Sequence, residues 1–158
     1  MKREPYQEYA TAAYRLRAQL GSAEEFVETL RTQAMENHGE SGAGKSLGSP
    51  TEAAVIRAEK LMEEQRAVLE DLAAADRAMM KIAQRDIGHE MLAALRIVYM
   101  EDVDRPLRRG EIQLRMQAAV HRLYVDTSTI YRWLRALRVA FARERGLRVQ
   151  NFEYPEAA

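Results

Sequence analysis

The strongest constraint on the fold lies near the C-terminus, where apolar residues recur with the spacing of an α-helix over residues 126–143. Steps of four, three and four residues place four of them on one side of such a helix, namely Ile130, Leu134, Leu137 and Phe141. Asp126 precedes this stripe, and its carboxylate can accept the free backbone amides of a first helical turn. The pattern predicts a helix that begins after Asp126 and buries one face.

A second amphipathic stretch stands directly upstream. The same spacing recurs there at Ile112, Met116, Ala119 and Leu123. Only Tyr124 and Val125 separate the two predicted helices, and two helices joined by so short an apolar connection are typical of a helix-turn-helix. The outer face of the second helix would then carry Ser128, Tyr131, Arg132 and Arg135.

Charge is distributed unevenly along the chain. The whole sequence holds 24 basic and 24 acidic residues, a formal net charge of zero. Residues 105–148 nevertheless contain eleven arginines against three acidic residues, a net charge of +8, while residues 1–104 carry −6. Arginine binds phosphates and guanine edges through two donors at once, so we expect this part of the chain to face a polyanion. The alternative to a polyanion-binding surface is an ordinary solvent-exposed helix surface that is rich in arginine.

Residues 91–148 resemble the C-terminal domain of small phage and prophage transcription regulators of the RinA and ArpU kind, whose helix-turn-helix is similar to region 4 of bacterial sigma factors. The residues that carry the resemblance are 95–100, Leu123 and 126–134, with the Gly/Ser-containing stretch 48–54 in the N-terminal half. Two features depart from that pattern: Tyr124 stands where such turns usually have Gly, and the connection 101–110 is longer. The resemblance implies transcription regulation of phage or prophage genes in the cytoplasm of a bacterial host, at the nucleoid.

The helix-turn-helix geometry assigns roles to particular side chains. Ser128 and Arg132 lie near the end of the recognition helix that reaches base edges, whereas Thr127 and Thr129 are placed to touch phosphates. The full set of predicted DNA-binding residues is Thr127, Ser128, Thr129, Tyr131, Arg132, Arg135, Arg108 and Arg109.

The N-terminal part is predicted to be helical as well, which makes the fold class all-α. A first helix would end at Gly21, and Ser22 with Glu25 form a capping box that opens a second helix to about Glu36. The expected organisation is a helical oligomerisation or interaction region at 1–85 with a flexible Gly/Ser loop at 37–48, a DNA-binding domain at 86–148, and a C-terminal tail at 149–158.

A long helix is predicted from Thr51 to about Arg85, opened by Ser49, Pro50 and Glu52. Apolar residues alternate at steps of four and three along it for about four heptads, which is typical of a coiled coil. Its seam can join two subunits, most simply as a dimer, can pack against residues 6–36 of the same chain, or can do both at once. The candidate oligomerisation residues are Leu61, Gln65, Val68, Leu72 and Met79. Val139, which the spacing places on the outer side of the recognition helix, is a further candidate contact with a second subunit.

Residues 39–46 match the phosphate-binding pattern GxxxxGK[ST] at every fixed position. That pattern needs a buried strand before it and a helix that starts at the lysine, Lys45, and neither is predicted here. The three histidines lack the i,i+4 spacing of a metal site, and cysteine is absent. We therefore expect no catalytic residue, no metal, no cofactor and no small-molecule substrate, and interpret the loop as a linker.

The sequence predicts a sequence-specific regulator that binds double-stranded DNA, with host RNA polymerase as a further candidate partner. It leaves two alternatives open: a small terminase-like DNA-packaging subunit, and a helical adaptor that docks on RNA polymerase without binding DNA. No stretch approaches the roughly 18 uninterrupted apolar residues that would span a bilayer, so no membrane partner is expected.

Overall fold

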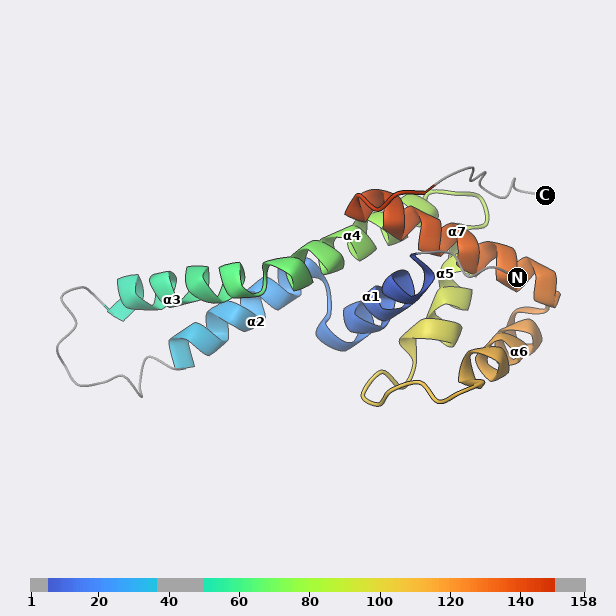
Figure 1. The fold of residues 1–158 in the computed structure, drawn as a ribbon, viewed down its shortest axis with the longest axis horizontal. Helices are drawn as coiled ribbons and strands as arrows, with labels where there is room; N and C mark the ends of the chain where they lie inside the picture. The colour runs from blue at the N-terminus through green and yellow to red at the C-terminus, as the bar shows by residue number, and fades with distance from the viewer. Residues whose placement is uncertain (1–5, 37–49, 150–158) are drawn as a thin grey trace.

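The computed structural model describes residues 6–36 and 50–149, and every regular element in these ranges is helical (Figure 1). In chain order the elements are α1 (Gln7–Leu20), α2 (Ala23–Glu36), α3 (Pro50–Glu64), α4 (Arg66–Ala83), α5 (Gly88–Leu95), the π-helical turn η1 (Arg96–Met100), α6 (Glu111–Leu123) and α7 (Thr127–Arg145). The predicted all-α fold is thereby confirmed. Within the described ranges, none of the helices is both long and apolar enough to cross a membrane.

The junction between α1 and α2 forms as its residues predict. Gly21 takes φ +88°, and its amide donates to the carbonyl of Arg17 at 2.9 Å, which ends α1. The Ser22 hydroxyl then accepts the amide of Glu25 at 3.1 Å, while the Glu25 carboxylate accepts the amide of Ser22 at 3.3 Å. This reciprocal capping box starts α2, which ends at Glu36 as expected.

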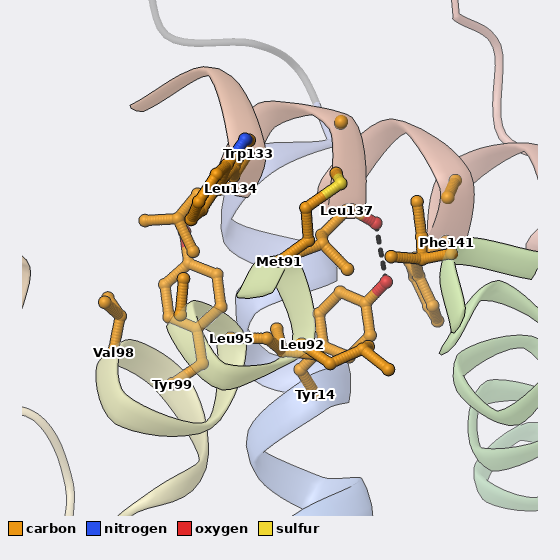
Figure 2. Packing of buried hydrophobic residues seen from close by; sticks show 14 of the residues in the cluster. Tyr14, Met91, Leu92, Leu95, Val98, Tyr99, Trp133, Leu134, Leu137 and Phe141 are labelled. Carbon is orange, nitrogen blue, oxygen red and sulfur yellow. Dashed lines mark hydrogen bonds between the residues drawn. The ribbon is translucent and has the colours of Figure 1, made fainter. Parts of the chain in front are cut away.

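One hydrophobic core joins α1 and α4 to the helices of the C-terminal part. Tyr14 of α1 and Ile82 of α4 are buried in the same cluster as Met91, Leu137 and Phe141. In Figure 2, Tyr14 of α1 lies beneath α7, and the labelled residues of α5 and η1 lie beside it. The expected division at residue 85 therefore does not separate two cores, because α1 and the C-terminal half of α4 form part of the body that contains α5, α6 and α7.

The α4–α5 connection depends on one glycine. A Cβ atom at Gly88 would lie 2.2 Å from the carbonyl oxygen of Ile82 and 3.0 Å from the backbone of Ala83. The backbone at residue 88 can come this close to α4 only because glycine has no side chain. This close approach allows α5 to fold back against α4.

The long helix predicted from Thr51 to Arg85 is interrupted. Gln65 leaves helical geometry, with φ −101° and ψ 19°, so α3 ends at Glu64 and α4 begins at Arg66. In Figure 1 the two helices continue in nearly the same direction, and α2 and α3 extend side by side away from the body. We call this pair of helices the arm.

The predicted seam is largely occupied within the chain. Leu72 is fully buried with Phe26 and Leu30 of α2, and Leu61 and Val68 pack against the same cluster. Met79 packs against the main core, and Gln65 is half-buried at the break. The structure shows the intrachain packing predicted for these residues, because α1 and α2 fold back onto α4. Leu72 in particular has no surface to offer a second subunit.

Val139 is also buried rather than directed outward. It is fully enclosed in a small cluster with Tyr6 and Ala142, against which Leu147 and Val149 pack. Segments just before α1 and just after α7 thus cover the side of α7 where a second subunit was a candidate.

The phosphate-binding pattern at 39–46 lies outside the described residues, as do the loop 37–48 to which it belongs, Ser49 and all of the predicted tail except Val149. The elements on its two sides are described. A helix, α2, ends before it at Glu36, and another helix, α3, begins after it at Pro50. The element that precedes the glycines is therefore not the strand that this kind of nucleotide site requires.

Candidate nucleic-acid interface

The predicted helix-turn-helix consists of α6, a connection at residues 124–126, and α7. The Asp126 carboxylate accepts the amide of Thr129 at 2.8 Å and the hydroxyl of Ser128 at 3.1 Å, so it caps α7 as predicted. Hydrogen bonds from Thr129 and Ser128 hold the pKa of Asp126 below its ordinary value. The predicted stripe is buried, since Ile130, Leu134, Leu137 and Phe141 are each at most 1% exposed.

The first turns of α7 present polar side chains on the opposite face. Ser128, Tyr131, Arg132 and Arg135 are exposed, and Thr127 and Thr129 are half-buried. A guanidinium nitrogen of Arg132 donates to the Thr129 hydroxyl at 3.2 Å, which holds the arginine along the outer face of the helix. The structure therefore brings the six α7 residues of the predicted site together on one surface.

The start of α6 lies beside this surface. Gln113 donates from its amide nitrogen to the Tyr131 hydroxyl at 3.0 Å, which joins the first turn of α6 to the first turns of α7. Arg108 and Arg109 are exposed in the residues that lead into α6. Six of the eight predicted DNA-binding residues are thus exposed, Thr127 and Thr129 are partly exposed, and all eight belong to two neighbouring helix starts.

The stretch of α7 from residue 136 to residue 142 is closed to a ligand. Every residue from 136 to 142 is buried, on all sides of the helix, because α4 and α5 cover one flank and the segments around Tyr6 and Leu147 cover another. Within α7, the exposed face that can lie against a nucleic acid is therefore in residues 127–135, and beyond the buried stretch only Arg143 is exposed among the described residues of this helix. This limits the contacting part of the recognition helix to about its first two and a half turns, at 3.6 residues per turn.

Two arginines that the charge count assigned to the surface are buried instead. Arg138, 7% exposed, donates to the Tyr99 hydroxyl at 3.0 Å. Arg115, 9% exposed, donates to the carbonyls of Val98 at 3.2 Å and Glu101 at 2.7 Å. Their guanidinium groups satisfy polar atoms inside the molecule, so neither faces a polyanion.

Three further arginines pair with carboxylates. Arg105 lies 2.7 Å from Glu111, Arg122 lies 3.1 Å from Glu101, and Arg145 lies 2.7 Å from Asp71. The net charge of +8 over residues 105–148 therefore overstates the positive surface. The arginines that remain exposed on this part of the chain and are not in these pairs are Arg108, Arg109, Arg132, Arg135, Arg143 and Arg148.

A pair of arginines from different helices fixes the connection that leads to α6. Arg15 of α1 donates to the carbonyls of Asp102 at 3.2 Å and Arg105 at 2.7 Å. Arg115 of α6 donates to the carbonyl of Glu101. Asp102, in this turn, has a positive φ of 50°. Sequence reasoning missed Arg15, because nothing in the local pattern of α1 indicates a contact some ninety residues away.

No family model matches this chain, and neither a curated protein nor a solved structure matches it. The likeness of residues 91–148 to phage and prophage regulators therefore stays a hypothesis from sequence.

Proposed function

We propose that this protein is a sequence-specific regulator of transcription that binds double-stranded DNA with the N-terminal turns of α7 in the major groove. The observation that carries the proposal is the division of α7 into two faces. Residues 127–135 present hydroxyls and two exposed arginines on one side, while the other side is locked into the core by Ile130 and Leu134. A rigid helix with such a face has the dimensions and the donors that major-groove recognition needs.

The side chains divide by their position on this surface. Ser128 and Arg132 lie on the exposed face of the first turns, where an arginine can donate twice to the edge of a guanine. Thr127 and Thr129 flank them with hydroxyl groups suited to phosphates. Arg108 and Arg109, at the start of α6, supply charge for the neighbouring stretch of backbone.

The burial and pairing of several arginines indicate that general electrostatic attraction contributes only modestly to DNA binding. Since Arg115 and Arg138 are buried and several other arginines are paired with acids, fewer positive charges are available to bind DNA of any sequence than the count of +8 suggests. Specific contacts from Arg132 and its neighbours then carry a larger share of the affinity. Regulation of phage or prophage genes follows from the sequence resemblance and forms part of the proposal.

Selection from a pool of random duplexes tests the proposal. The full-length chain is expected to enrich one short motif over successive rounds, and the Arg132→Ala variant to lose the preference at a defined base pair within it. Circular dichroism and thermal melting of the variant, whose arginine is exposed, serve as the control for folding. A pool that stays random after selection by the folded wild-type protein would contradict sequence-specific binding.

A further inference from the structure

Tyr124, at the turn between α6 and α7, has an unusual combination of backbone and exposure. It ends α6 in the left-handed conformation, with φ 56° and ψ 42°. Its side chain is 93% exposed, more than any other large apolar side chain among the described residues. Left-handed geometry is unfavourable for a residue with a Cβ atom, and glycine would adopt it without strain.

The fold gains nothing visible from this side chain. Within residues 6–36 and 50–149, no hydrogen bond of the Tyr124 hydroxyl and no ring contact of its aromatic group is found, and the ring lies outside all three hydrophobic clusters. Strain and exposure of a large aromatic both act against stability. Residues held in such conformations gather at sites where a ligand uses them.

The position of Tyr124 identifies the ligand surface. It lies two residues before the cap Asp126 and three before Thr127, the first residue of the recognition helix. Figure 1 shows the α6–α7 connection at the end of the molecule opposite the arm. If the first turns of α7 enter a major groove, a side chain at this turn extends toward the sugar–phosphate backbone that borders the groove.

We propose that Tyr124 is a positioning residue for DNA, whose ring packs against the sugar–phosphate backbone at the edge of the major groove and whose hydroxyl donates a hydrogen bond to a phosphate oxygen. This inference rests on the proposed function. It assigns a backbone contact to a residue that the pattern of the site does not include.

The chemistry of such a contact differs from that of the arginines in two measurable ways. A contact to the backbone contributes equally on every DNA sequence, unlike a contact of Arg132 to a base edge. Because the phenol is neutral at ordinary pH, it displaces no counterion, so its loss leaves the salt dependence of binding unchanged. Loss of Arg108 should instead lower the slope of log K against log salt by about one.

The experiment measures two quantities, thermal melting and DNA affinity, for Tyr124→Gly and Tyr124→Phe. Affinity is measured by fluorescence anisotropy on the duplex selected by the wild-type protein and on a scrambled duplex. Tyr124→Gly should melt at or above the wild-type temperature, because glycine relieves the strained backbone, and should bind both duplexes roughly fivefold more weakly. Tyr124→Phe should lose part of that affinity and keep the salt slope. Met80→Ala, an exposed position on α4 (64%), is the control and should change neither quantity.

Three results would overturn the inference while leaving the proposed function intact: wild-type affinity in Tyr124→Gly, a loss confined to the selected duplex, or a lower melting temperature, which would show that the ring serves the fold. In each of these cases wild-type protein still selects a motif and Arg132→Ala still loses it. If the wild-type protein binds neither duplex, the proposed function fails and this inference fails with it.

Discussion

The hydroxyl of Tyr14 donates a hydrogen bond of 2.5 Å to the backbone carbonyl of Leu137, and so links α1 to the middle of α7 (Figure 2). Both residues are fully buried. The Tyr14 ring also lies 5.8 Å from that of Phe141, one turn further along α7. The helix proposed to read DNA is thus supported from behind by the first helix of the chain.

Removing this hydroxyl should destabilise the fold without altering the DNA-facing surface. We expect Tyr14→Phe to lower the free energy of unfolding by about 0.5–1.5 kcal/mol, the usual net value of one hydrogen bond, as measured by urea denaturation. Tyr9→Phe is the matched control, because the Tyr9 hydroxyl bonds to Asp71 at the surface, and it should cost less. Equal losses in the two variants would argue against a special role for the buried bond.

Arg115 and Arg109 should respond oppositely to the same substitution. Arg115→Met leaves the carbonyls of Val98 and Glu101 without their donor and breaks the 2.7 Å pair with Glu111, so we expect a loss of about 3 kcal/mol in unfolding free energy. Arg109→Met, at an exposed position, should stay within about 0.5 kcal/mol of wild type. If Arg109→Met proved the more destabilising, the division into structural and surface arginines would be wrong.

Glu111 should make stability depend on acid pH. Hydrogen bonds from the Arg105 side chain first, then from the Arg108 amide and the Arg115 side chain, lower its pKa from 4.5 to about 2. A pKa that is lower in the folded than in the unfolded chain means that the stabilisation is fully present above about pH 4.5 and is lost as the pH falls toward 2. NMR titration of the carboxyl should show this value directly. Glu111→Gln should flatten the stability profile in that window, and an unchanged profile would contradict the assignment.

Local features of the fold were predictable because their causes lie close together in sequence. The cap at Asp126 is three residues from the amide it accepts, and the buried stripe of α7 follows from the helical period alone. The capping box at Ser22 and Glu25 is equally local. The placement of the exposed α7 site residues then follows, since they lie on the side opposite the stripe.

Features that depend on distant contacts could not be predicted in this way. Arg145 resembles any other arginine in a basic helix, yet its partner Asp71 lies 74 residues earlier in the chain. Arg138 is buried because Tyr99, 39 residues away, accepts its hydrogen bond. The period of the α3–α4 seam was recognisable, but nothing in it distinguishes a second chain from α1 and α2. Charge counts and hydrophobic periodicity describe a single helix, whereas the elements packed against that helix determine which of its faces stays exposed.

The most direct test of the central claim compares Arg132→Ala with wild-type protein on the selected and scrambled duplexes, by anisotropy at fixed salt. If the first turns of α7 read bases, the variant should lose about 1–3 kcal/mol of binding free energy on the selected duplex and clearly less on the scrambled one. An equal loss on both duplexes would contradict base recognition by Arg132, and wild-type affinity of the variant on both would contradict any contact between Arg132 and DNA.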